Sequence, residues 1–224
     1  MMPMKNFLQN LILGIFAGML IGIGGASNLQ LSSMGYPVLG GIFFSFGLMC
    51  VCLLGARLFT GKVGYALENR PSYLLDVLYM AIGNVIGALI VGYLCGLIFP
   101  SWNYALEPKL LYGEGASWYL CFFRAMGAGV FVYLAVECFR KIENVFAKLF
   151  MVMLSIATMV ILGCNHSIAN VFYFAYGQVR FQGFDGLNAT LSVLVAMIGN
   201  SLGSIIIYLL QRGFVIALKP KGDA

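Results

Sequence analysis

Long apolar stretches alternate with shorter polar stretches along the chain, and there are six of the apolar stretches. Four of these stretches are continuous, and we expect helices at about residues 7–26, 74–99, 118–139 and 187–216. About 20 apolar residues in a helix cross the roughly 30 Å hydrocarbon core of a bilayer. Each of the four stretches is therefore predicted to span a membrane.

The other two stretches, residues 38–67 and 146–176, are interrupted near residues 56–64 and 163–170. A polar, glycine-containing interruption at membrane depth indicates backbone that leaves the helical path, which is tolerated only inside protein or along a cavity. The second interruption, GCNHSIAN, contains His166, the single histidine of the chain. An ionisable residue at this depth indicates a functional site. We interpret this stretch as the middle of a pore.

Composition supports a membrane protein, because 61% of the residues are hydrophobic and only 9% are charged. The net charge of +5 does not indicate nucleic-acid binding, since lysine and arginine are scattered at the segment ends and form no basic stripe. The six cysteines lie within apolar runs without metal-ligand spacing, so we expect neither a metal nor a cofactor.

Charge also sets the expected orientation, since six crossings place both termini on one side. One face would carry Lys5, Lys62, Arg70, Arg140, Lys141, Lys148, Arg212, Lys219 and Lys221. The opposite face would carry only Lys109 and Arg180. The positive-inside rule therefore predicts a multi-pass protein of the cytoplasmic (inner) membrane with both termini in the cytoplasm.

The chain repeats itself at low similarity. The pattern Ile-Gly-Asn-x-x-Gly occurs at residues 82–87 and again at 198–203, and each half of the chain contains one interrupted stretch. Each half has three crossings, an odd number, so the halves would lie inverted in the membrane. Paired interrupted segments in such halves point to a transport site near the bilayer midplane. We expect one channel domain over residues 1–224, with repeats at about 5–99 and 117–216.

Three motifs carry a resemblance to a known family. They are GCNHSIAN at residues 163–170, RLFT at 57–60, and the Gly-Asn pairs at 83–84 and 199–200. Together they resemble the formate/nitrite transporters, which include formate, nitrite and hydrosulfide channels, over nearly the whole chain. The resemblance implies an all-α homopentamer with an aquaporin-like protomer, broken second and fifth helices, and one pore through each protomer.

The resemblance also implies roles for individual residues. His166 would be the central pore histidine, facing Thr60 on the second-helix loop, with Asn200 in the supporting polar network. Two apolar constrictions would be formed by Phe44, Leu48, Leu58, Phe59, Val132 and Met159. The family's pore-mouth lysine aligns with Gly113, so Lys109 is the nearest candidate, and Arg124 is the alternative cation. The chain also departs from the family at Gly129, where an asparagine is common, and at Met159, where phenylalanine is common.

The chemistry of the site favours a weak acid as the permeating species. A bare anion in an apolar constriction costs several kcal/mol or more, whereas an anion that takes up a proton can cross as a neutral acid. Histidine suits such an exchange, because its protonation state changes readily near physiological pH. We therefore expect a channel for a small monovalent anion, with formate or nitrite favoured over hydrosulfide, and proton exchange at His166.

Other classes fit the sequence less well. An enzyme would need clustered carboxylates, several histidines or a nucleophile with its base, and Glu137, the carboxylate deepest in a predicted span, has no evident partner. An aquaporin-like channel for neutral solutes would share the architecture, but the paired Asn-Pro-Ala motifs of that class are absent. A membrane assembly subunit without transport activity stays open, as do the identity of the anion and the direction of flow.

Overall fold

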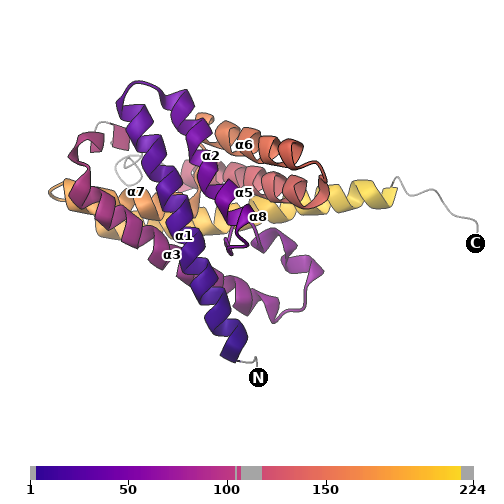
Figure 1. Cartoon of the computed structure of the whole chain (residues 1–224). Coiled ribbons are helices and arrows are strands. Elements are labelled where there is room, and N and C mark those ends of the chain that lie inside the picture. Colours follow the sequence, from indigo (N-terminus) through magenta and orange to yellow (C-terminus); the bar gives the residue numbers. More distant parts are fainter. Residues whose placement is uncertain (1–3, 104, 107–117, 218–224) are drawn as a thin grey trace, which may run out of the picture.

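The structure, a computed structural model, describes residues 4–103, 105–106 and 118–217, and within these ranges it contains helices and no strand (Figure 1). The first half comprises α1 (Met4–Ser33), α2 (Pro37–Leu53), η1 (Val63–Glu68), α3 (Tyr73–Ile98) and η2 (Pro100–Trp102). The second half comprises α5 (Trp118–Lys141), α6 (Val145–Ile161), α7 (Ser167–Arg180) and α8 (Gly186–Ala217).

Four described helices, α1, α3, α5 and α8, are long and apolar enough to cross a membrane. They correspond to the four continuous stretches, so the prediction of four long apolar helices at these places is confirmed. Each interrupted stretch instead begins with an apolar helix of 17 residues, α2 or α6, which is about 26 Å long. The chain then leaves the helix and resumes in η1 or α7.

Helix α1 ends at Ser33, well beyond the predicted end near residue 26. Its last two turns contain polar residues that the sequence pattern assigned to a loop, but these residues find partners inside the fold. The Oδ1 of Asn28 accepts a hydrogen bond from the hydroxyl of Tyr173 at 3.2 Å. The Oε1 of Gln30 accepts one from Nε1 of Trp102 at 2.7 Å. Satisfied polar groups can continue a helix that hydrophobicity alone would end.

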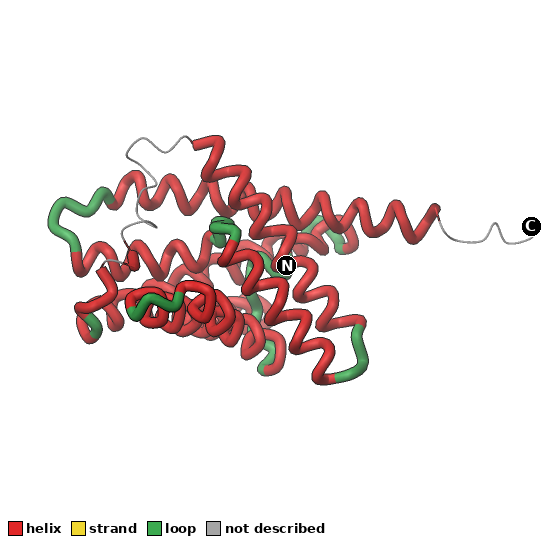
Figure 2. Tube along the Cα trace, turned by 90° about the horizontal axis from the view of Figure 1, so that it is seen from above, coloured by secondary structure: helices red, strands yellow, loops and turns green. Residues whose placement is uncertain are grey.

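The helices pair in the same way in both halves. Helix α1 packs against α3 and α2, and α5 packs against α8 and α6. At two crossings the backbones touch: a Cβ on Gly18 would lie 2.1 Å from the carbonyl oxygen of Asn84, and one on Gly129 would lie 2.1 Å from that of Asn200. Only glycine allows such an approach. Both ribbon views show the C-terminal end of α8 projecting beyond the neighbouring helices (Figures 1 and 2).

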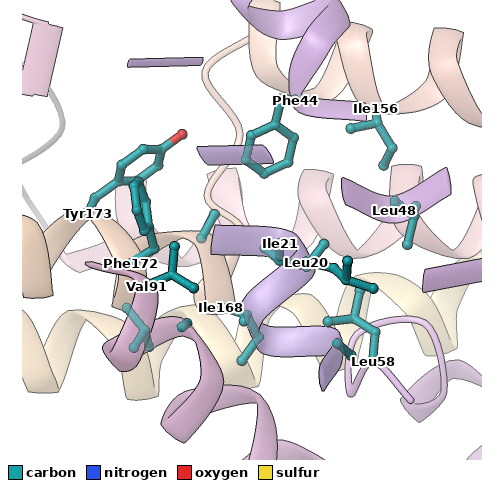
Figure 3. Packing of buried hydrophobic residues seen from close by; sticks show 14 of the residues in the cluster. Leu20, Ile21, Phe44, Leu48, Leu58, Val91, Ile156, Ile168, Phe172 and Tyr173 are labelled. Carbon is teal, nitrogen blue, oxygen red and sulfur yellow. The ribbon is translucent and has the colours of Figure 1, made fainter. Parts of the chain in front are cut away.

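Helix α7 lies at the centre of the fold, because every residue from 167 to 177 is buried. It is in contact with α3, α8 and α1. Figure 3 shows apolar side chains from α1, α2, α6 and α7 converging with Leu58 of the loop after α2. The first residues of α7 are therefore held inside the protein, and His166 directly precedes them.

Candidate functional site

The two breaks begin with the same backbone turn. Gly55 and Gly163 follow the ends of α2 and α6 with φ of +69° and +67°, values that favour glycine. One residue later, the amide of Ala56 bonds to the carbonyl of Val51, and that of Cys164 to the carbonyl of Met159, each at 3.0 Å. These bonds are the Schellman motif, which ends a helix at a left-handed glycine. The breaks therefore arise from local sequence.

Asn200, on α8, supports the second break. Its Oδ1 accepts the amide hydrogen of Ser167 at 2.9 Å. Its Nδ2 donates to the carbonyl oxygens of Ala125, at 2.7 Å, and Asn165, at 2.8 Å. Asn200 is fully buried, so it satisfies backbone groups that the broken helix leaves without partners. The resemblance implied that Asn200 takes part in a polar network, and the three hydrogen bonds above are the ones that it makes.

Asn84, on α3, makes the matching set of bonds at the first break. Its Oδ1 accepts the amide hydrogen of Phe59 at 2.7 Å, and its Nδ2 donates to the carbonyl oxygens of Gly14, at 2.8 Å, and Arg57, at 2.9 Å. In each break one residue lies between the donor and the acceptor that the asparagine contacts. That residue is Leu58 in the first half and His166 in the second, so these two residues occupy corresponding positions.

His166 is 3% exposed and is the N-cap of α7. Its Nδ1 accepts the amide hydrogen of Ala169 at 3.2 Å, and its Nε2 lies 2.8 Å from Oγ1 of Thr60, which is itself 1% exposed. Because Nδ1 acts as an acceptor, the neutral ring carries its hydrogen on Nε2 and donates it to Thr60. The ring therefore joins α7 to the loop after α2.

A cavity of about 220 Å³ lies against one side of His166, and we call it the His166 cavity. Its apolar wall includes Phe44, Met159 and Tyr173, and its polar wall includes Arg124, Cys164, Asn165 and Asn170. No described carboxylate lines it. The Nδ2 of Asn170 is buried, and no described residue accepts a hydrogen bond from it. The cavity therefore offers a guanidinium and an unused amide donor beside the imidazole.

A second cavity, of about 360 Å³, shares no lining residue with the first. We call it the Arg57 cavity, and its charged residues are Arg57, Lys62 and Arg140. Phe44 lines the first cavity and Leu48 the second, and both belong to α2. Four residues of helix rise about 6 Å. On α5 the nearest lining residues, Arg124 and Val136, are twelve residues apart, which is about 18 Å of rise. At least about one helical turn of protein therefore separates the two cavities.

The structure brings together five of the six residues expected at the constrictions. Phe44, Leu48, Leu58, Val132 and Met159 are each 2% exposed or less and belong to one apolar cluster. Phe59 is also buried, but it belongs to a separate cluster with Val63 and with Val77 and Ala81 of α3. The structure therefore separates Phe59 from the other five. Lys109 lies outside the described residues, whereas Arg124 lines the His166 cavity.

The surroundings of Glu137 were not predicted from the sequence. Its carboxylate accepts hydrogen bonds from Tyr65, at 2.8 Å, and Gln211, at 3.4 Å, and forms ion pairs with Lys141, at 2.8 Å, and Arg140, at 3.3 Å. The statement that this residue has no evident partner is therefore wrong. The two basic residues stand three and four positions later on the same helix, where side chains are neighbours, and this spacing was the available signal.

A second polar contact was also missed. The guanidinium of Arg57 donates a hydrogen bond to the Oδ1 of Asn10, and the Nδ2 of Asn10 donates one to Asp76. Asn10 is 1% exposed and links α1 to the loop after α2 and to α3. An arginine in an interrupted apolar stretch signals a need for partners, but neither Asn10 nor Asp76 is adjacent to it in sequence.

Helices of spanning length, and a buried polar site on the wall of a cavity, are typical of integral membrane proteins of the transporter and channel class. Residues 3–212 match the family model described as formate/nitrite transporter, so the chain belongs to the formate/nitrite transporter family. The expected family is therefore confirmed, and with it the expectation of a transport protein in place of an enzyme.

Individual relatives agree with this assignment. The chain is 26% identical over 202 residues to a "Probable formate transporter" of Methanothermobacter thermautotrophicus, which covers 75% of this chain and 74% of that protein. Its fold is similar to that of a "Pentameric formate channel with formate bound", with a TM-score of 0.80 at 18% identity over 96% of this chain and 99% of that one. An "FNT family ion channel" matches with the same TM-score at 19% identity, over 96% and 91% of the two chains.

Proposed function

We propose that the chain is a channel for a small monovalent weak-acid anion, with formate or nitrite as the first candidates and hydrosulfide as the next. The observation that carries this proposal is the pair of cavities separated by at least about one helical turn of buried apolar side chains, with His166 on the wall of one of them. An apolar barrier between two polar cavities suits a solute that is charged in each cavity and neutral between them. The relatives described as a formate transporter and a formate channel support the choice of substrate.

The proposed protomer has six crossings arranged as two inverted three-helix repeats in an aquaporin-like fold, with one channel domain over residues 1–224. The matching bonds of Asn84 and Asn200, the matching glycines at the helix crossings, and the matching turns at Gly55 and Gly163 support the repeat. Three crossings in each half reverse its direction, so equivalent residues such as Leu58 and His166 would approach the midplane from opposite faces.

The proposed assembly is a homopentamer in the cytoplasmic membrane with both termini in the cytoplasm. The pentameric description of one structural relative supports the assembly, and the excess of basic residues on one face supports the orientation. Large apolar side chains exposed along the helices, including Leu78, Leu94, Phe123 and Leu194, would face lipid or neighbouring subunits. In this orientation the Arg57 cavity opens toward the cytoplasm and the His166 cavity toward the outside.

Proton exchange in this proposal depends on the two bonds of the imidazole. The neutral ring uses Nε2 to donate to Thr60 and Nδ1 to accept from Ala169. An additional proton can bind only at Nδ1, and only after the bond from the Ala169 amide opens. An anion in the His166 cavity offsets the positive charge of the protonated ring, so the two titrate together. The proton then passes from Nδ1 to the anion, the neutral acid crosses the apolar turn, and the ring accepts from Ala169 again.

The test is formate uptake into liposomes that contain the purified protein and a trapped pH indicator. Uptake should rise as the outside pH falls, and one proton should enter with each formate. The variant His166→Asn separates the two roles of the ring, since asparagine is an effective N-cap but does not titrate. We expect this variant to fold, to lose the pH dependence, and to transport roughly a hundredfold more slowly.

The matched control is Thr158→Val, which replaces an exposed hydroxyl on α6 outside both cavities. Unchanged flux and an unchanged pH profile in His166→Asn would show that the histidine acts only as the N-cap of α7. Passage of glycerol or urea without any anion flux would identify a neutral-solute channel instead. A protein that moves neither, although folded in the liposomes, would be an assembly subunit.

A further inference from the structure

The Arg57 cavity gathers three cationic side chains from two elements. Arg57 and Lys62 lie in the loop after α2, and Arg140 lies in the last turn of α5. No aspartate or glutamate is among the described residues that line this cavity. Arg57 and Lys62 also line an adjoining cavity of about 300 Å³ that contains Asp76, and Asp76 accepts a hydrogen bond from Asn10 there. Glu137 is paired with Arg140 and Lys141.

The three cations differ in how they are compensated. Arg57 reaches Asp76 through Asn10, and Arg140 contacts Glu137 and lies over the ring of Tyr65 at 4.4 Å. Lys62 is half-buried, and among the described residues its ammonium has no acceptor within hydrogen-bond distance and no ion pair. The basic groups that act on it, Arg140 and Arg57, both repel it. A desolvated cation without a partner is costly, and a bound anion would remove that cost.

We infer that the Arg57 cavity is a binding site for a small oxyanion, held by Lys62 and Arg57 on the far side of the apolar turn from His166. Its part in transport rests on the proposed function, whereas anion binding itself does not. The volume of about 360 Å³ accommodates such an ion together with several waters, each of which occupies about 30 Å³. Because the site has more than one cation, a divalent oxyanion such as inorganic phosphate binds it more tightly than formate does.

The site has a clear use in the proposed transport cycle. A weak acid that crosses the apolar turn as a neutral molecule must release its proton before it leaves as an anion. Positive potential from Lys62, Arg57 and Arg140 stabilises the anionic form in this cavity and so favours that release. Phosphate in the same place competes with the permeating anion and slows transport.

Direct binding tests the site without reference to transport. Inorganic phosphate should raise the unfolding temperature of the detergent-purified protein, because a ligand that binds only the folded state stabilises it. In Lys62→Met, the phosphate concentration needed for half of this shift should rise about tenfold. Lys62 has no described partner to lose, so this variant should fold. Arg70→Gln is the matched control, since Arg70 is an exposed cation outside the cavity lining, and its phosphate response should equal that of the original protein.

Flux measurements then connect the site to transport. Phosphate on both sides of the liposome membrane should inhibit formate exchange by the original protein and by Arg70→Gln, and should inhibit Lys62→Met and Arg57→Gln several-fold less. The half-saturating formate concentration should also rise in these two variants. A channel that conducts formate but shows the same phosphate response in all four proteins would overturn the inference. A phosphate response that depends on Lys62 in a protein that conducts nothing would uphold the binding site and refute the proposed function.

Discussion

Thr60 and His166 are 106 positions apart in the chain, and their side chains meet at 2.8 Å in the centre of the fold. The bond joins the loop that follows α2 to the first turn of α7, so it holds the two broken segments in register. Both residues are almost fully buried. A buried polar pair of this kind is stabilising only while both partners remain.

Replacement of Thr60 by valine tests the pair with little change in volume. The Nε2 hydrogen of His166 loses its acceptor, and an unsatisfied buried donor costs about 1–3 kcal/mol. We expect a lower free energy of unfolding and slower formate flux in Thr60→Val, with recovery in Thr60→Ser, which restores the hydroxyl. Unfolding of the purified protein and liposome flux are the measurements. If the stability and formate flux of Thr60→Ser are no higher than those of Thr60→Val, the hydroxyl has no role in either property.

The cap of α7 gives a second prediction, on stability alone. His166→Ala removes the acceptor for the Ala169 amide, whereas His166→Asn retains one. We expect the alanine variant to be less stable than the asparagine variant by about 1 kcal/mol, the usual value of an N-cap. Asn144→Ala is the benchmark variant, because the side chain of Asn144 caps α6 by accepting the amide hydrogen of Ala147 at 2.9 Å. Equal stability of His166→Ala and His166→Asn would show that Nδ1 does not cap α7.

Gly129 gives a third prediction. A Cβ at this position would lie 2.1 Å from the carbonyl oxygen of Asn200, which is backbone and cannot move aside easily. Gly129→Ala should therefore separate α5 from α8 and destabilise the protein by at least 1–3 kcal/mol, roughly the cost of overpacking a core. Gly213→Ala is the control, since nothing lies within 4 Å of its Cβ position. Asparagine, common in the family at the place of Gly129, should be worse than alanine here.

Asn84 and Asn200, which form hydrogen bonds with the two breaks, give a fourth prediction. Asn84→Leu and Asn200→Leu each leave three backbone groups without their side-chain partner. Each should destabilise the protein by about 2–4 kcal/mol, since two buried backbone groups of the break become unsatisfied together. Their effects should be similar in size, because their bonds are equivalent. A large effect of one and a negligible effect of the other would argue against equivalent breaks.

Much of the fold could be predicted from the lengths of the apolar stretches and from the glycine and polar residues that interrupt them. Apolar runs of about 20 residues identified the four long helices, and glycine beside polar residues identified the two breaks. The end of α1 could not be predicted this way, because Asn28 and Gln30 are satisfied by Tyr173 and Trp102, which are distant in sequence.

The site was less accessible to sequence reasoning than the fold. Pairing of His166 with Thr60 was implied by the family resemblance, since nothing in the spacing of the two residues indicates that they meet. Phe59 lies in irregular backbone, which has no period from which the direction of a side chain can be read, and it packs toward α3. The cations of the Arg57 cavity come from the loop after α2 and from α5, so only the folded chain assembles them.

The two halves of the fold differ in the helix that follows each break. After its break, the second half continues in α7, with 14 residues, whereas the first continues in η1, a 3-10 helix of six residues. Short 3-10 helices have weaker backbone bonds, and η1 depends on side-chain contacts such as that of Tyr65 with Glu137. The segment that follows the first break is therefore more compliant than α7, which lines the His166 cavity through Ala169, Asn170 and Tyr173. Amide hydrogens of residues 63–68 should therefore exchange with deuterium sooner than those of residues 170–177, so the two halves should open locally at different rates although their breaks match.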